Sequence, residues 1–324
     1  MKAISRILVA IKNPWARSLP SVDKAVRLAR ALGAEVRLFH ALSEPVVVDV
    51  REIQNLANLE RIRRERVLAQ LMVVARRLCG EITVTVAAEW DYPPHEAVIR
   101  AAHPFKASLI VAELHPASHR MPWLPRFTDF ELLRLSAVPV LLVKTRPPYT
   151  RPVVLVALDP GHARAKPAEL DAQILHYGSA VTRALRGALH AVYAHDSRPA
   201  GPALPGEGAA GAAGIARRAQ SQARAALDRT VRSSVTRARR HVIAHHPVEA
   251  IDTVAREIGA HIVVMGAISR SGARRLVIGN TAEKLLDRLA CDMLIVKPID
   301  FSNRVPMTSR GAQMVAHSGV QTGY

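Results

Sequence analysis

Aromatic residues and cysteines are scarce in this chain of 324 residues. Aromatic side chains make up only 4% of it, so we expect aliphatic cores built from Val, Leu, Ile and Ala. The two cysteines, Cys79 and Cys291, lie far apart and outside any CxxC pair. This argues against a disulfide framework and for a reducing compartment, with both thiols acting as small buried hydrophobic groups.

Uninterrupted apolar runs are short throughout the chain. None approaches the roughly 20 residues that a helix needs to cross a bilayer. The run nearest the N-terminus, Ile7–Ile11, ends at Lys12 and is too short for the core of a signal peptide. We therefore expect a cytoplasmic protein without a membrane span.

Sequence signatures of catalysis are also missing. There is no nucleophile elbow, no Walker loop with its lysine and no HExxH pair. Histidines cluster locally, but His245 and His246 are adjacent and would point to opposite faces of a strand. We expect no metal site and no enzymatic activity beyond, at most, very slow ATP hydrolysis.

Acidic residues are outnumbered, with 27 against 45 lysines and arginines, and the formal net charge is +18. The densest basic segment, 217–240, sets arginines among aliphatic residues such as Leu227 and Val231, as on an amphipathic helix. Such a surface attracts nucleic acid, but no aromatic residues interleave with it for base stacking. An RNA- or DNA-associated protein is therefore an open alternative.

The chain does contain an internal repeat. The segments that begin at Pro94, Ala107 and Val138 match those that begin at Pro247, Ala260 and Cys291. Each pair is separated by the same 153 positions, as 94 and 247 illustrate. A single shift over so long a stretch indicates that a domain has been duplicated.

Each copy alternates apolar strand patterns with helical ones. The first strands, at 7–11 and 153–158, are continuous apolar runs, as expected where a parallel sheet is covered on both faces. We predict an α/β fold of two tandem doubly wound parallel five-stranded sheets. The predicted domains are 1–146 and 151–300, followed by a disordered tail at 301–324.

Ligands of doubly wound sheets bind beyond the carboxyl ends of the strands. In the second copy one such strand ends at Gly266, a loop runs through Ser269, and Gly279, Asn280 and Thr281 open a helix. Glycine lets the backbone approach a phosphate, and a helix N-terminus offers it free N–H groups. The same pattern also suits an ordinary capped helix, and the residues alone leave both interpretations open.

This stretch resembles the universal stress protein family. Its nucleotide-binding members carry Gly, two residues, Gly, nine residues, and then Gly followed by Ser or Thr. Gly266 and Gly279 match that spacing, with Ser269 at the middle position and Asn280 at the hydroxyl position. Asp159 matches the family's aspartate at the end of the first strand. The resemblance covers roughly residues 4–300 and is greatest to the tandem branch called universal stress protein E.

The resemblance implies a non-enzymatic cytoplasmic protein of stress and DNA-damage resistance. It also implies ATP or another adenine nucleotide in the second domain, held by Asp159, Gly266, Gly279, Asn280 and Thr281. Because Ser269 adds a side chain where the family has bare backbone, another phosphate-bearing ligand is an alternative. A stress-related scaffold without nucleotide is a further one.

The first copy departs from the family pattern. Lys12 replaces the first-strand aspartate, and the shift of 153 places Glu113 at the Gly266 position and Arg126 at the Gly279 position. The carboxylate of Glu113 repels a polyphosphate, and the loop lacks the glycines that let the backbone approach one. We therefore predict no nucleotide there in the family manner. Because family members commonly pair along the last strand, we expect 138–144 and 291–297 to form an intrachain pseudo-dimer. Association into a homodimer is left open.

Overall fold

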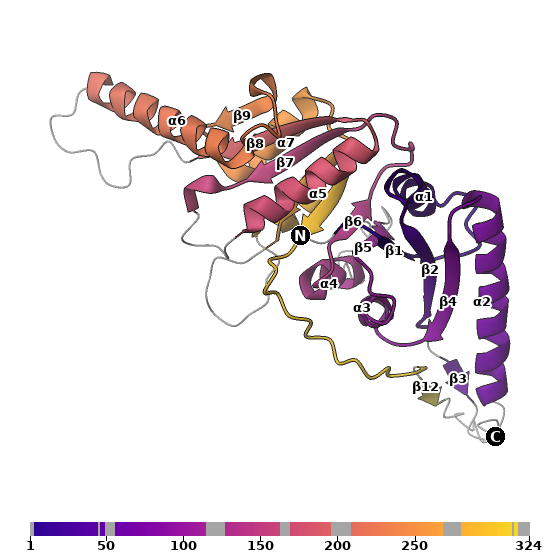
Figure 1. Cartoon of the computed structure of the whole chain (residues 1–324). Helices are drawn as coiled ribbons and strands as arrows, with labels where there is room; N and C mark the ends of the chain where they lie inside the picture. The colour runs from indigo at the N-terminus through magenta and orange to yellow at the C-terminus, as the bar shows by residue number, and fades with distance from the viewer. Residues whose placement is uncertain are drawn as a thin grey trace. The chain divides into compact units, whose positions relative to one another are not determined.

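The computed structural model describes residues 3–44, 46–48, 56–114, 127–162, 169–195, 209–267, 280–312 and 314–316 (Figure 1). The chain divides into two compact units. Lys2–Val140 together with Asn303–Tyr324 forms one, here called the first domain, and Leu141–Ser302 lies in the other, the second domain. The division thus falls just before the proline-rich segment at 147–152, and the end of the chain groups with the first domain.

The first domain alternates strands and helices. Its elements are β1 (Arg6–Ala10), α1 (Pro20–Leu32), β2 (Glu35–Leu42), β3 (Val46–Val48), α2 (Leu56–Leu78), β4 (Val84–Trp90), α3 (Pro94–Ala102), β5 (Leu109–Glu113) and α4 (Phe127–Leu135). Four parallel strands lie in the order β4-β2-β1-β5. Figure 1 shows α3 and α4 on one side of this sheet and α2 on the other.

The second domain repeats this plan. Strand β6 (Val140–Val143) lies at the division between the two units. The elements that follow it are β7 (Val153–Leu158), α5 (Leu170–Ala184), β8 (Ala188–Ala194), α6 (Ala209–Val231), β9 (Arg240–Ile243), α7 (Pro247–Glu257), β10 (Ile262–Gly266), α8 (Asn280–Arg288) and β11 (Asp292–Val296). Parallel strands lie in the order β11-β10-β7-β8-β9. The predicted α/β fold with tandem parallel sheets is confirmed.

Local sequence explains why these elements form. Ile7, Leu8 and Val9 of β1 are fully buried, because helices cover both faces of a parallel sheet. Helix α1 begins with a proline in its first turn and ends at Gly33, whose φ of 65° closes the helix in the left-handed conformation. The first connection of the domain is therefore encoded by a short stretch of sequence.

The predicted disordered tail needs correction for its described part. The backbone N–H of Arg310 donates to Asp91 Oδ1 at 2.9 Å, and Arg100 Nη1 donates to the carbonyl of Pro306 at 3.0 Å. Val305 is buried, and β12 (Met314–Ala316) pairs in parallel with β3. Composition missed this contact because the tail's partners are preformed polar groups of the first domain.

Candidate functional site

The structure describes the predicted second-domain site in part. Asp159 follows β7 and Gly266 ends β10, and these strands are neighbours in the sheet, so both residues lie at one carboxyl edge. Thr281 is half-buried in the first turn of α8, which begins at Asn280. Two predicted residues, Ser269 and Gly279, lie outside the described residues, as does the side chain of Asn280.

Gly266 is closely approached by a neighbouring helix. A Cβ atom added to it would lie 2.7 Å from Leu170 Cδ2 and 3.4 Å from Ile174 Cδ1, both on α5. Leu170 and Ile174 are buried. Glycine at this position therefore serves helix packing, a requirement that the loop pattern did not indicate.

The turn after β7 is packed in a similar way. A Cβ atom on Gly161 would lie 2.1 Å from the hydroxyl of Tyr193, which is buried on β8. On the same edge His195 Nε2 lies 2.6 Å from Gln220 Oε1, and Gln220 Nε2 donates to the carbonyl of Val242 at 3.2 Å. Helix α6 is thus tied to the ends of β8 and β9, and protein side chains fill this part of the edge.

A buried lysine that the sequence analysis missed lies beside Gly266. Lys297 follows β11, and its Nζ donates to the carbonyl of Ala267 at 3.0 Å and lies 4.8 Å from the ring centre of Phe301. Burial lowers the pKa of Lys297 to about 8, so the amine is still mostly protonated at pH 7. It adds a positive charge to the predicted phosphate site.

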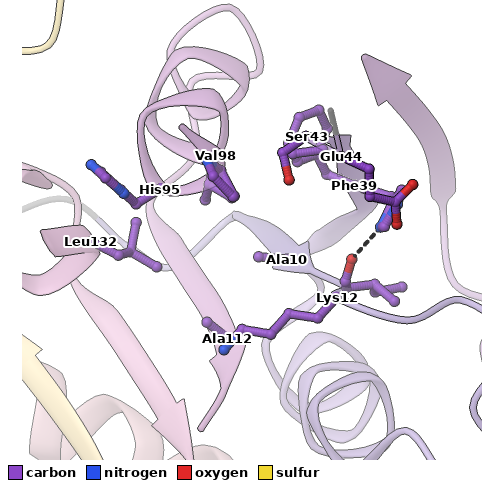
Figure 2. Close-up of a pocket in the computed structure, with 13 residues that line it drawn as sticks. Ala10, Lys12, Phe39, Ser43, Glu44, His95, Val98, Ala112 and Leu132 are labelled. Carbon is purple, nitrogen blue, oxygen red and sulfur yellow. Dashed lines mark hydrogen bonds between the residues drawn. The ribbon is translucent and has the colours of Figure 1, made fainter. Parts of the chain in front are cut away.

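The first domain has a cavity at the equivalent edge. A pocket of about 230 Å³ opens at the carboxyl ends of β1, β2 and β5 (Figure 2). Its apolar wall comes from three strands and two helices and includes Ala10, Phe39, Val98, Ala112 and Leu132. The sequence analysis predicted no nucleotide in the family manner in this copy, and it did not find this pocket.

His40 is held in one orientation in this pocket. Its Nδ1 lies 2.7 Å from the carbonyl oxygen of Ile11, so Nδ1 carries the hydrogen and Nε2 is left as an acceptor. Burial lowers the pKa of His40, while the Ile11 carbonyl and Glu44 partly offset that effect. The ring is therefore neutral at pH 7 and offers a fixed hydrogen-bond acceptor.

Charged and polar groups surround the mouth of the pocket. Lys12 extends along the side formed by Ala112, whereas Glu44 lies near Ser43 on the other side (Figure 2). His95 comes from the first turn of α3, and burial lowers its pKa despite the acidic side chains nearby. An apolar cavity with a few oriented polar groups is the usual form of a small-molecule site.

The two copies diverge at one position of this edge. In the β1–β2 pair Ala10 lies opposite Phe39, and in the β7–β8 pair Ala157 lies opposite Val192. The residue that follows is His40 in the first copy and Tyr193 in the second, again 153 positions apart. The smaller imidazole lies beside an open pocket, whereas the phenol packs against the turn that follows β7.

Glu113, at the Gly266 position, has a structural partner. Its Oε2 accepts a hydrogen bond from Ser21 Oγ of α1 at 3.3 Å, and Ser21 is buried. The first copy therefore joins its first helix to this strand through a polar pair. In the second copy the first helix, α5, meets the equivalent strand, β10, through the apolar contact between Leu170 and Gly266.

Comparison with known proteins gives the chain its family. The family model for universal stress proteins matches residues 3–144 and 152–297. The chain belongs to the universal stress protein family. It is a tandem member, because one family domain matches each half.

Relatives of similar length agree with that assignment. "Universal stress protein E" from Salmonella typhi is 24% identical over 319 residues, covering 94% of this chain and 98% of that protein. A protein of unknown function from Pseudomonas aeruginosa PAO1 has a TM-score of 0.68 at 22% identity, covering 92% and 94% of the two chains. A universal stress protein from Archaeoglobus fulgidus DSM 4304 has a TM-score of 0.61 at 18% identity, with 92% and 98% covered. The predicted family and fold are confirmed.

The described residues lack a membrane-spanning helix and a metal-binding cluster. None of the helices in the described ranges is both long and apolar enough to cross a membrane. Within the same ranges, no three His, Cys, Asp or Glu side chains gather closely enough to hold a metal ion.

Proposed function

We propose that this universal stress protein is a non-enzymatic, cytoplasmic stress-response protein that holds a small ligand in its first domain. The observation that carries the proposal is the cavity of about 230 Å³ at the ends of β1, β2 and β5. Doubly wound sheets bind their ligands at this edge. The apolar wall suits the body of a small molecule, and Lys12 and His40 suit its polar groups.

The polar groups of the pocket favour binding over catalysis. The hydrogen of His40 Nδ1 goes to a backbone carbonyl, whereas a catalytic triad orients its histidine with a carboxylate. Lys12 and Glu44 are exposed at the mouth of the pocket, where neither is desolvated as an activated group would be.

A second candidate function is a phosphate-bearing ligand, ATP or another adenine nucleotide included, in the second domain. It is favoured by the order of strand, loop and helix between Gly266 and Asn280 and by the charge of Lys297 beside it. Asp159, Ser269, Gly279 and Thr281 belong to this proposal. We rank it second because Leu170 packs against Gly266 and Tyr193 against Gly161 at this edge.

Family membership supports a role in stress resistance, with tolerance of DNA damage as one form of it. The pseudo-dimer formed by the strands at 138–144 and 291–297 is part of the same proposal, and a homodimer is an open alternative. Nucleic-acid binding is less favoured, because Arg240 of the basic segment pairs with Asp228 at 2.7 Å and its side chain is mostly buried. Anisotropy of labelled RNA and DNA at increasing salt tests that alternative.

Mass spectrometry of the chain purified without added ligand separates the two sites. We expect a small molecule to be retained by the wild type and by Gly266→Glu but lost from Val98→Trp, whose indole fills the first-domain pocket. Circular dichroism checks that both variants fold. Loss from Gly266→Glu alone would favour the second domain. If neither a retained molecule nor heat on ATP titration is found, the scaffold function without ligand replaces both proposals.

A further inference from the structure

Helix α2 has apolar side chains on two opposite faces. Val67, Leu71 and Val74 are buried against the first domain. On the outward face four large apolar side chains are 36% to 51% exposed, and these are Leu59, Ile62, Met72 and Val73. A helix on the surface of a domain normally presents polar residues to water, so this second apolar face indicates a binding surface.

Three of these residues lie on one stripe. Leu59, Ile62 and Val73 are spaced with Arg66 and Ala69 at steps of three and four residues, which places these five on one side of the helix. The stripe therefore runs along most of the length of α2.

An exposed tryptophan extends the stripe sideways. Trp15 is 48% exposed, and the guanidinium of Arg66 lies 5.9 Å from its ring centre. Gln70 Nε2 donates to the carbonyl of Pro14 at 3.0 Å, which holds the Trp15 turn against the helix. Trp15 and the stripe together are called the α2 surface below.

The second domain provides an internal comparison. Helix α6 holds the corresponding place in the repeat, and buries Leu227 and Val231 in the same way. Its exposed face carries mainly alanine, serine, glutamine and arginine, with Ile215 as an exposed large apolar side chain. The fold therefore does not require an apolar outer face at this place, and the α2 surface is a feature of the first domain.

Charge identifies the partner of this surface. Helix α2 contains two acidic residues, Glu60 and Glu65, and six basic ones, which are Arg61, Arg63, Arg64, Arg66, Arg76 and Arg77. A second copy of the chain would bring an equally positive helix against it. Nucleic acid would neutralise the arginines but would leave the aliphatic side chains without an apolar partner. A bilayer that contains anionic lipid satisfies both kinds of side chain.

We propose that the α2 surface binds anionic phospholipid membranes. The helix lies in the plane of the membrane, with Ile62, Val73 and Trp15 at the boundary between headgroups and acyl chains. The arginines of α2 contact lipid phosphates, except Arg64, whose Nε donates to the Ala88 carbonyl at 2.8 Å. The proposal concerns attachment to one face of a bilayer and does not depend on the ligand pocket.

Sedimentation of the full chain with lipid vesicles tests this proposal. We expect binding to vesicles of phosphatidylglycerol and phosphatidylcholine, and at least tenfold weaker binding to phosphatidylcholine alone. The double variant Ile62→Asp/Val73→Asp should bind the mixed vesicles at least tenfold more weakly, because both side chains would enter the apolar boundary. Arg66→Glu should weaken binding and reduce its dependence on salt.

The control is Ile215→Asp on α6, which places one aspartate on the exposed face of the other long basic helix. It should bind vesicles as the wild type does. A loss of binding equal to that of the double variant would overturn the proposal, as would failure of the wild type to bind mixed vesicles. A concentration-dependent dimer in light scattering that the double variant abolishes would instead assign the surface to a second copy and also overturn it.

Discussion

At the scale of single residues, His40 and Tyr193 show how one substitution separates two copies of a domain. Both residues follow the same paired position in the second strand of their copy. The imidazole turns back to the Ile11 carbonyl, whereas the phenol packs against Gly161. The side chain at this position thus contributes to whether space is left for a ligand.

Replacing His40 with Ala should destabilise the first domain by about 1–3 kcal/mol, because the buried Ile11 carbonyl loses its donor. Urea unfolding measures the change. His40→Asn, which can restore a donor to the carbonyl, should recover part of the loss. Equal stability of His40→Ala and the wild type would show that the Ile11 contact contributes nothing.

A histidine pair in the second domain predicts acid sensitivity. His190 Nδ1 on β8 lies 3.0 Å from His241 Nε2 on β9, and their rings stack. Burial, the His241 ring and Arg239 together lower the pKa of His190 to about 4. Burial lowers the pKa of His241 as well, although Glu257 opposes that effect. One N–H and one lone pair form this contact, so protonation of both rings breaks it.

The pKa of His190 in the folded protein is lower than its unfolded value of about 6.5. The neutral His190–His241 pair therefore stabilises the folded state fully above pH 6.5, and this stabilisation is lost as the pH falls toward 4. Urea midpoints measured between pH 7 and pH 4.5 should fall more steeply for the wild type than for His190→Gln. Parallel slopes for the two proteins would show that the pair does not sense pH.

At the scale of elements, the contact of α5 with the end of β10 gives Gly266 a packing role. The glycine permits an approach of helix to strand that a methyl group would obstruct. Helix α6 shows the opposite case. Its Gly214 has no atom within 4 Å of an added Cβ, so glycine there has no packing role.

We therefore expect Gly266→Ala to destabilise the second domain by about 1–3 kcal/mol through overpacking against Leu170. Gly214→Ala, in an open helical position, should stabilise α6 by about 0.5–1 kcal/mol. Thermal unfolding of both variants measures the contrast. Adding Leu170→Ala should reduce the further cost of Gly266→Ala, and strict additivity of the two changes would argue against a direct clash.

At the scale of the whole molecule, polar networks hold the connecting segments in each domain. In the second domain buried Asp292 accepts hydrogen bonds from the Lys144 and Thr145 backbone N–H groups at 2.8 and 2.9 Å, and from the Tyr149 hydroxyl at 2.6 Å. In the first domain Asp91 and Arg100 form a buried pair at 2.6 Å that also binds the tail.

Removing 303–324 should lower the stability of the first domain and speed amide exchange in α3, because Arg100 and Asp91 lose their tail partners. A chain that ends at Ala316 keeps these contacts and serves as the control. Hydrogen exchange read by mass spectrometry resolves α3 from the second domain. Exchange in α3 that is the same in both truncated chains would show that the tail does not stabilise this helix.

Sequence alone determined the repeat, the parallel sheets and the strand ends at Asp159 and Gly266. These features depend on apolar runs, turns and caps, which are formed by residues close together in the chain and can therefore be recognised in the sequence. Tertiary structure alone decided that the first copy encloses a cavity at this edge, and that Leu170 packs against Gly266 and Tyr193 against Gly161 in the second. These features depend on contacts that join elements far apart in the chain. The tail was misjudged for the same reason, because its hydrogen-bond partners are more than 200 residues away.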